Sequence, residues 1–337
     1  MQNLINKTIS VIVIHNFEKH FVENIKITLL QVGHIVIIDN NSRLNNIKLL
    51  QKLKSEHSER ITLIRNKKNY GLATAQNQGI KLAHSLKFEW ILFLDQDSTM
   101  KSDMVKNMFS FYIKNNNFVF LGPQIIEQNI YKENKYFVKN NKELFSKRKS
   151  IKKITNFDDI LVIISSGSLI KLNVFKKIGL FRDGFFIDYI DFEFSLRARF
   201  SNIKIALVKE AILYHYQGSQ SSHNVGFFNI NCHNYHASRR YTIARNRFFY
   251  IRLYASRLPI IIFNEVCAIL FDIFKVLLFE KNKGFKFLQI MIGILHGTTN
   301  KIPKYLKFEK IKLVDKGCNY DVYTEQITEK ITNKIKG

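Results

Sequence analysis

The chain of 337 residues is long enough for one large domain or two, each with its own buried core. Its hydrophobic content of 46%, with 13% aromatic residues, excludes a disordered chain. The formal charge of +25 favours an anionic partner such as a nucleotide diphosphate, an anionic lipid or a nucleic acid. Lysine is abundant throughout the chain, so charge alone does not select among these partners.

The cysteines and the N-terminus bear on the compartment. Cys232, Cys267 and Cys318 are widely separated and form no C-x-x-C pair, which indicates neither a disulfide framework nor a zinc site. The apolar run that begins at residue 9 is short and strand-like, without the small-residue cleavage site of a secretory signal. The sequence therefore predicts a protein of the reducing cytoplasm.

The first hundred residues alternate between strand and helix patterns. Apolar, largely β-branched runs typical of buried strands occupy 9–14, 34–38, 61–64 and 90–94. Helical patterns lie between them, at 18–31, 44–55 and 72–86. This alternation with short links predicts an α/β fold with a mostly parallel sheet and helices on both faces.

Polar residues follow each of these strands, where ligands bind in open α/β sheets. Asn16, Asp39 and Asn69 are expected to line one crevice with the two aspartates that follow the fourth strand. Asp39 fits either a turn or a contact to a base or ribose. Asn69 and Gly71 are ambiguous alone, but together they would let the backbone approach a ligand at a helix N-terminus.

The stretch WILFLDQDST carries the strongest chemical signal. A buried strand ends in Asp95-Gln96-Asp97, and two carboxylates so close together repel each other unless something compensates their charge. A hard divalent cation with oxygen ligands would do so. The alternative is a solvated turn in which Asp97 and Ser98 cap a following helix.

The pattern is less regular in the second half of the chain. A helix is predicted at 104–115, a strand at 118–121 that ends in Gly-Pro, and a Lys/Asn-rich excursion with a hairpin at 127–159. Small residues at 165–169 form a turn or allow close approach of a substrate, and a short helix follows at 173–178. A further strand is predicted at 203–208.

A second acidic cluster lies among aromatic residues. Asp188, Asp191 and Glu193 fall within six residues, and Glu193 can pair with Arg197 one helical turn later. Asp191 fits a helix cap, but its apolar setting would also raise its pKa toward that of a general base.

Of the histidines in the second half of the chain, His215 is a candidate ligand, and three others lie near Cys232 without the spacing of a zinc site. His215 is either structural or a ligand of a metal or phosphate, and the acidic clusters before it favour the second role. His223, His233 and His236 with Cys232 match no zinc spacing.

The C-terminal part is predicted to be helical and basic. Arginines punctuate an aromatic segment at 236–258, a pattern that suits phosphate, membrane-interface or nucleic-acid contacts. Residues 258–279 approach the length of a membrane span, but Asn264, Glu265, Asp272 and Lys275 fall on one stripe, which predicts an amphipathic helix. This helix would rest on an anionic membrane leaflet or pack back on the domain.

Eight stretches between about Ser10 and Tyr254 together carry a family resemblance. They are, in order, VIVIHNF, IVIIDNNS, NYGLATAQNQGI, FLDQDS, SSGSLI, IGLFRDGFFIDYIDFEFSLR, YHYQG and RRYTIARNR. They resemble the family-2 glycosyltransferases of the GT-A fold, and the DQDS and FIDYIDFEFSLR forms resemble the bacterial rhamnosyltransferases. His15 departs from the Thr or Ser usual in the family, which leaves the base-contacting role of that strand end open. The resemblance implies a catalytic domain over 1–235 and a helical, amphipathic extension over 236–337.

The resemblance also implies roles for individual residues. The donor nucleotide sugar would be bound by Asn16, Asp39, Asn69, Gly71, Asp95, Gln96, Arg240 and Arg245, with Asp39 at the base, Asp95 at the ribose and the arginines at the diphosphate. Asp97 and His215 would hold Mg²⁺ or Mn²⁺. Asp191 would be the catalytic base, with Ser166, Gly167 and Asp188 near the acceptor.

The implied reaction is an inverting transfer of L-rhamnose from dTDP-L-rhamnose to a hydroxyl of a polyprenyl-diphosphate-linked glycan, as in O-antigen or capsule synthesis. The enzyme would contact an anionic membrane peripherally at its cytoplasmic face and bind no nucleic acid. One alternative keeps the fold and mechanism with UDP-galactose, UDP-glucose or UDP-N-acetylglucosamine as donor. A more distant alternative is a basic lipid- or nucleic-acid-binding protein, against which the acidic clusters argue.

Overall fold

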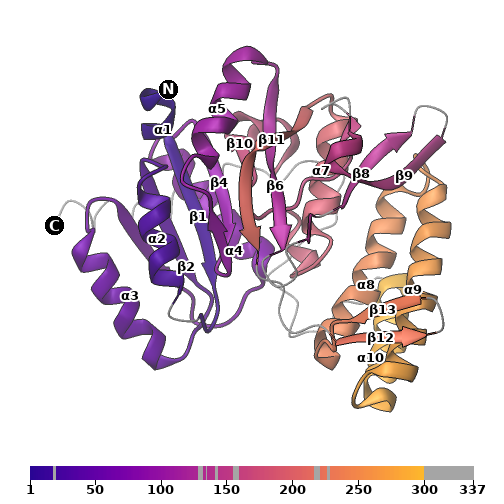
Figure 1. The fold of residues 1–337 in the computed structure, drawn as a ribbon. Helices are drawn as coiled ribbons and strands as arrows, with labels where there is room; N and C mark the ends of the chain where they lie inside the picture. Colours follow the sequence, from indigo (N-terminus) through magenta and orange to yellow (C-terminus); the bar gives the residue numbers. More distant parts are fainter. Residues whose placement is uncertain are drawn as a thin grey trace.

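The computed structural model has a mixed α/β fold built on a single central sheet (Figure 1). It describes residues 1–17, 20–127, 132–133, 135–140, 143–154, 159–215, 221–225 and 228–299. The sheet order is β3-β2-β1-β4-β10-β6-β11-β5, with β7 beside β6. Its strands are β1 (Thr8–Ile14), β2 (His34–Asp39), β3 (Ile61–Arg65), β4 (Trp90–Asp95), β5 (Ser98–Met100), β6 (Phe118–Glu127), β7 (Lys132–Glu133), β10 (Leu169–Lys171) and β11 (Lys204–His215).

The first four long strands, β3, β2, β1 and β4, pair in parallel, as the alternating pattern predicts. Successive side chains of a strand point to opposite faces, so β4 contributes to two separate cores. Ile91 and Phe93 belong to one core, and Leu92 and Leu94 to the other. The parallel half therefore confirms the predicted architecture.

Helices cover both faces of the sheet. The face with Leu92 is covered by α2 (Phe21–Leu29), α3 (Leu44–Glu56) and α5 (Met104–Lys114). The face with Phe93 is covered by α4 (Leu72–Ser85), α6 (Asn173–Ile178) and α7 (Ile190–Phe200). The last turns of α8 (Ala237–Tyr254) join the same core through Phe249, Tyr250 and Tyr254. Short helices α1 (Gln2–Asn6), η1 (Ile151–Lys153) and η3 (Asp183–Phe185) complete this part.

The other half of the sheet differs from the sequence prediction. Strands β10 and β5 are antiparallel to their neighbours, and β6 continues through Gly122 and Pro123, where a strand end was predicted. Pro123 lacks an N–H, and the register with β11 shifts by a bulge directly after it, where the missing donor is tolerated. Because Ser98 begins β5, the alternative in which Asp97 and Ser98 cap a helix is wrong.

Two hairpins and two further helices complete the described chain. The hairpin predicted in the excursion is β8 (Lys135–Asn140) paired with β9 (Glu143–Ser150), and β12 (Ser221–Val225) pairs with β13 (Phe228–Cys232). The helices are α9 (Ile260–Phe279) and α10 (Lys283–Thr299), which lie with α8 at one side of the molecule (Figure 1). None of the helices in the described ranges is both long and apolar enough to cross a bilayer.

Candidate active site

Three ionisable side chains meet at the carboxyl end of β4. Asp95 ends β4 and Asp97 follows after one residue, in the turn to β5. His215 ends β11 and pairs in register with Ser98 of β5, which brings its ring to the same turn. The Nε2 atom of His215 lies 3.9 Å from Asp95 Oδ2 and 3.8 Å from Asp97 Oδ1.

The donor set of this group fits a divalent cation. The three ligand atoms lie within 4.8 Å of one another. Ligands about 2.0–2.6 Å from an ion can be at most about 5 Å apart, so one ion could contact all three. Burial raises the pKa of Asp97, and the charge of Asp95 adds to the shift while His215 opposes it. Burial alone would lower the pKa of His215, but the two carboxylates raise it. The predicted ligands Asp97 and His215 are thus brought together, with Asp95 as a third.

Ser166 and Gly167, predicted to approach the acceptor, lie beside the turn between β4 and β5 that carries Asp95 and Asp97. The Ser166 hydroxyl accepts from the Asp95 backbone N–H at 3.0 Å and lies 2.8 Å from Ser98 Oγ. Gly167 has φ +80°, and a Cβ there would lie 2.5 Å from Pro123 Cγ. Ser166 is 1% exposed, and the observed partners of its hydroxyl lie in the turn that carries the candidate metal ligands.

Gln96 ties the end of β1 to the end of β4. Its Oε1 atom accepts from the His15 backbone N–H at 2.8 Å, at the carboxyl ends of these two neighbouring strands. Asn16 follows with a left-handed backbone at φ 54°, and its Oδ1 accepts from the Arg43 N–H at 3.0 Å. The side chains of Asn16 and Gln96 thus hold the loops of the predicted crevice in place.

Asp39 makes the turn interaction that the sequence predicts, and its second oxygen bears on the predicted ligand contact. Its Oδ1 atom accepts from the Ser42 N–H at 2.8 Å, which is the turn interaction. Its Oδ2 atom is buried and accepts no hydrogen bond from the described residues, although Arg65 Nε lies 3.5 Å away. A buried carboxylate oxygen left without a donor is suited to a ligand N–H.

The loop before α4 is organised differently from the prediction. Asn69 Oδ1 accepts from Asn40 Nδ2 and from the Gly71 N–H, both at 2.9 Å. The group that closely approaches Gly71 is Phe186, whose carbonyl accepts from the Leu72 N–H at 2.6 Å. The first turn of α4 is therefore occupied by the chain itself. Asn40, which sequence reasoning did not single out, also accepts from the Tyr70 N–H and centres this loop.

The members of the second acidic cluster have different partners. Arg239 donates two hydrogen bonds to the Asp188 carboxylate, of 2.8 and 3.1 Å. Asp191 lies in the first turn of α7, and no ion pair joins it to a cation in the described part of the chain. Burial raises the pKa of Asp191 to about 6, helped by the charges of Asp188 and Asp95 and opposed by the Phe192 N–H. Asp191 is therefore the carboxylate of this cluster best suited to exchange a proton near neutral pH.

The segment that leads to Asp191 has an unusual backbone. Phe186, Asp188 and Tyr189 are all left-handed, with φ of 62°, 63° and 67°. Such conformations cost non-glycine residues about 1–3 kcal/mol each, so the surroundings must hold them. Asn246 of α8 does so by donating to the carbonyls of Phe185, Ile187 and Asp188 at 2.8–3.0 Å. Asn246 lies within the RRYTIARNR stretch, but its side chain alone gave no sign of this partner.

The two arginines predicted to bind the donor diphosphate are committed to the protein interior. Arg245 is fully buried and donates to the Gly184 carbonyl at 2.9 Å, so it supports the same left-handed segment. Arg240 is 3% exposed and pairs with Glu280, and with Asp272 at 3.4 Å. The structure thus gives both guanidinium groups partners within the protein and does not bring them to the group of Asp95, Asp97 and His215.

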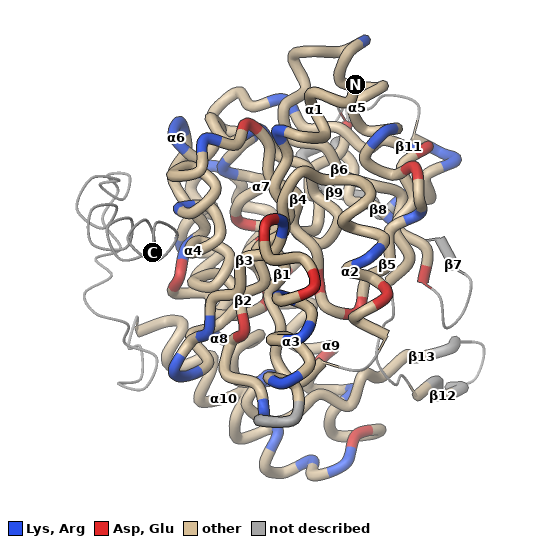
Figure 2. The backbone as a smooth tube through the Cα atoms, turned by 90° about the vertical axis from the view of Figure 1, so that its left-hand side faces the viewer, with Lys and Arg blue, Asp and Glu red and all other residues tan. Residues whose placement is uncertain are grey.

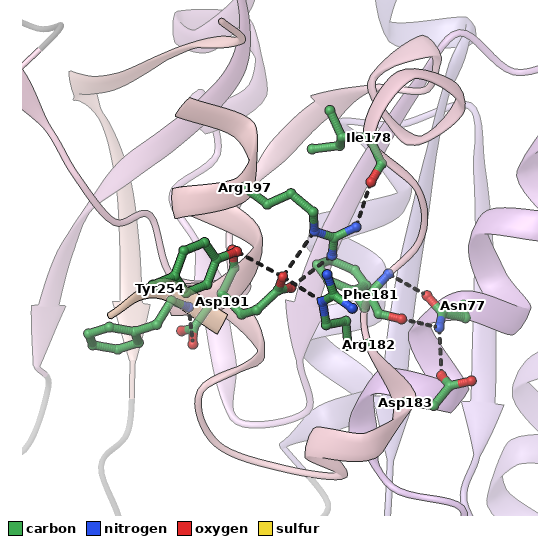
Figure 3. Close-up of polar contacts among 10 residues, drawn as sticks. Asn77, Ile178, Phe181, Arg182, Asp183, Asp191, Arg197 and Tyr254 are labelled. Carbon is green, nitrogen blue, oxygen red and sulfur yellow. Dashed lines mark hydrogen bonds and ion pairs between the residues drawn. The ribbon is translucent and has the colours of Figure 1, made fainter. Parts of the chain in front are cut away.

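Glu193 anchors α7 beneath Asp191. It is fully buried and receives Arg182 at 2.8 Å, Arg197 at 2.8 Å and the Tyr254 hydroxyl at 3.0 Å (Figure 3). The predicted pair with Arg197 is confirmed. Burial would raise the pKa of Glu193, but the two guanidinium groups lower it overall.

We expect Glu193→Gln to lower the free energy of unfolding by about 3 kcal/mol, because it removes the fully buried carboxylate that two partly buried guanidinium groups share. Thermal and urea melts would measure this loss. The matched control is Glu23→Gln, which removes an exposed pair with Lys26 and should cost less than about 1 kcal/mol. Equal melts for the two variants would contradict an anchoring role.

The histidines near β12 and β13 have ordinary partners. His236 Nδ1 lies 2.9 Å from the Ser238 hydroxyl at the start of α8, and the rings of His223 and His233 stack on Phe279 and Tyr235. Within the described ranges, the group with metal-binding spacing is Asp95, Asp97 and His215. Cys318 lies outside the described residues.

The sheet carries acidic residues and a histidine at the carboxyl end of β4, and comparison with known proteins shows which family this arrangement belongs to. Residues 10–179 match the family model for glycosyl transferase family 2. The chain belongs to this family and is a glycosyltransferase of the GT-A fold. This assignment displaces the alternative of a basic binding module.

A particular relative refines the comparison. The chain is 32% identical to the dTDP-rhamnosyl transferase RfbF of Shigella flexneri over 253 residues, which is 74% of this chain and 81% of that one. Among solved structures it is similar to GalNAc-T7 with UDP, GalNAc and Mn²⁺, at a TM-score of 0.49 and 17% identity, over 62% of this chain. It is also similar to S. aureus TarS, at a TM-score of 0.48 and 13% identity, over 86% of this chain. The chain spans 43% of the length of each of these two structures.

Proposed function

We propose that this enzyme transfers L-rhamnose from dTDP-L-rhamnose to a hydroxyl of a lipid-linked glycan, with inversion at the sugar. The observation that carries the proposal is the group of Asp95, Asp97 and His215 at the carboxyl end of β4. Asp191, in the first turn of α7, adds a carboxylate whose pKa burial raises to about 6. The relative from Shigella flexneri supports the choice of donor.

Each site has its own task in a displacement reaction. Asp95, Asp97 and His215 would hold Mg²⁺ or Mn²⁺, which supplies positive charge to the diphosphate leaving group. Asp191 would accept the proton of the acceptor hydroxyl as that oxygen attacks the sugar carbon. A carboxylate with a pKa of about 6 is largely ionised at neutral pH yet basic enough to take up a proton during the attack. Asp188, held by Arg239, would contact the acceptor beside it.

Calorimetric titration tests the donor assignment. dTDP-rhamnose, UDP-glucose, UDP-galactose and UDP-N-acetylglucosamine are each titrated with Mn²⁺, with Mg²⁺ and without added metal. We expect metal-dependent binding of dTDP-rhamnose at least tenfold tighter than that of any UDP-sugar. A UDP-sugar that bound most tightly would keep the mechanism and overturn the rhamnose assignment. A folded sample that bound none of the four would overturn the proposal.

We expect Asp39→Asn to weaken dTDP binding by about ten- to a hundredfold, the cost of about 1.5–3 kcal/mol for losing a charged acceptor. The Oδ2 atom of Asp39, which accepts no hydrogen bond from the described residues, would accept the N3–H of thymine, and in the variant an amide N–H would face that donor instead. Because N3 of cytosine is an acceptor, the variant should lose its preference for dTDP over dCDP. Titration of both nucleotides measures this ratio. An unchanged ratio would remove Asp39 from the base site.

The proposed acceptor is a growing glycan on a polyprenyl diphosphate, which places the enzyme at the cytoplasmic face of the membrane. The high positive charge of the chain suits an anionic leaflet. In Figure 2 the Lys and Arg residues are distributed over many elements, with acidic residues between them. A transfer assay with synthetic polyprenyl-diphosphate glycans tests this acceptor class against free oligosaccharides. Equal rates on both would overturn the lipid-linked assignment.

A further inference from the structure

Large apolar side chains are concentrated on the outer surface of the two C-terminal helices. Of the exposed large hydrophobic residues in the described ranges, five are scattered over other elements and twelve lie on α9 and α10. The twelve, which we call the outer face, are Ile262, Phe263, Val266, Leu270, Phe271, Phe274, Leu277, Leu278, Phe285, Leu288, Met291 and Leu295. Scattered apolar residues are normal on a protein surface, whereas a concentration of this kind indicates a binding surface.

The outer face follows the helical periodicity. At about 100° per residue, its members on α9 cover roughly half of the helix circumference, and no charged residue lies among them. On α10, its four members follow one another at spacings of three, three and four residues and form a single stripe. The predicted amphipathic helix is therefore present. The three charged residues of its polar stripe, Glu265, Asp272 and Lys275, point into the protein, whereas Asn264 is exposed.

The charges of these helices are paired inside. Asp272 receives Arg247 at 2.7 Å and Lys275 at 2.7 Å, and Lys286 pairs with Glu280 at 2.9 Å. The side chains in these pairs are at most 14% exposed. Helices α9 and α10 therefore carry their paired charges on the side that faces the protein and apolar side chains on the side that faces outward. A helical hairpin exposed to water has the opposite arrangement.

The charges that remain on the surface have one sign. The acidic residues between 257 and 299 are Glu265, Asp272 and Glu280, and all three are largely buried. The exposed charged residues of the same stretch are Arg257, Lys281 and Lys283, which lie near the two ends of α9. A basic rim around an apolar face complements anionic headgroups over hydrocarbon. Two copies of a chain with charge +25 would instead bring like charges together.

We propose that the outer face is a docking surface for an anionic lipid bilayer, on which α9 and α10 lie in the interface without crossing it. The inference rests on the proposed lipid-linked acceptor, which such docking would bring near the site. A direct connection supports it: Tyr189 of the left-handed segment donates to Glu265 of α9 and accepts from Arg247 of α8 at 2.9 Å. The inner side of α9, opposite the outer face, is therefore hydrogen-bonded to the segment that presents Asp191.

Vesicle flotation with the full chain tests the docking surface. The test variant carries Leu270→Gln and Leu288→Gln, both on the outer face and more than half exposed. The matched control carries Leu30→Gln and Leu86→Gln, two exposed leucines on other parts of the chain. Because all four side chains are exposed, both variants should fold, which circular dichroism verifies.

The expected result is flotation of wild type and control with vesicles of phosphatidylcholine and phosphatidylglycerol. The outer-face variant should partition at least tenfold more weakly, and vesicles of phosphatidylcholine alone should bind wild type less than mixed vesicles do. Failure of wild type to float with mixed vesicles, or equal flotation of both variants, would overturn the proposal. A wild-type dimer by light scattering that the outer-face variant abolishes, without flotation, would assign the face to a second copy.

Nucleotide-sugar titration of the same samples separates this proposal from the proposed function. The residues proposed to bind the donor lie outside α9 and α10, and neither variant changes them. Wild type and both variants should therefore bind dTDP-rhamnose equally. A chain that floats but binds no nucleotide sugar would overturn the proposed function alone. A chain that binds dTDP-rhamnose but does not float would overturn the docking surface alone.

Discussion

Asp97→Asn should lower the rate of sugar transfer by about three orders of magnitude, equivalent to about 4 kcal/mol of transition-state stabilisation. The substitution removes one of the two carboxylates through which the candidate metal site would compensate charge on the leaving diphosphate. It should not reduce stability, because Asp97 is partly buried and lies beside the like charge of Asp95, and both effects raise its pKa. Transfer assays over a Mn²⁺ titration, together with thermal melts, measure both effects.

The neighbouring Asp103→Asn is a matched control for this experiment. Asp103 carries the same functional group with the same 40% side-chain exposure as Asp97, but its partner is Lys101 at 3.5 Å. It should leave both the rate and the metal dependence unchanged. Transfer by Asp97→Asn at the wild-type rate, with the same Mn²⁺ requirement, would remove Asp97 from the metal site.

The fold could be predicted where the local pattern matches the final environment. The strands β1, β2 and β4 are buried on both faces, and their apolar runs reveal this directly. Strands β5 and β10 have three residues each, too few to show a period, and they exist because long-range pairing selects them. The continuation of β6 past Pro123 depends on a bulge in β11, some eighty residues later, which no local pattern announces.

The candidate site divides in the same way. Asp95, Asp97 and Asp191 could be found because ionisable groups in apolar surroundings need a chemical reason. The roles of Ser166 and Arg240 could not, because a small polar residue at a turn, or an arginine in a basic helix, has many equivalent partners. The partner of Arg240 is Glu280, forty residues later, and only the packing of α8 against the end of α9 brings the two together.

Asp191→Asn should lower turnover by about 10²–10⁴-fold and leave dTDP-rhamnose binding intact, because it removes the proposed base without touching the donor site. In the wild type, the pKa of about 6 predicts that the rate rises tenfold per pH unit below pH 6 and levels off above it. The residual rate of the variant should lack this dependence. Asp188→Asn is the comparison, since it should weaken acceptor binding yet keep the rise centred near pH 6. A variant at position 191 that retained the acidic limb would make Asp188 the better candidate for the base.

The same pKa shift makes a prediction about stability, which needs no assay of activity. The pKa of Asp191 is higher in the folded chain, at about 6, than its ordinary value of 3.8. Between these values the folded chain binds more protons than the unfolded chain, so this group's contribution to stability falls as pH rises from about 4 to about 6. Asp191→Asn lacks that loss and should melt above the wild type at pH 8, with the difference shrinking toward pH 4. The other titrating groups are common to both proteins and largely cancel in the difference. If the wild type lost no stability relative to the variant over this range, Asp191 would not be desolvated enough to act as a base, and the physical argument for its role would fail.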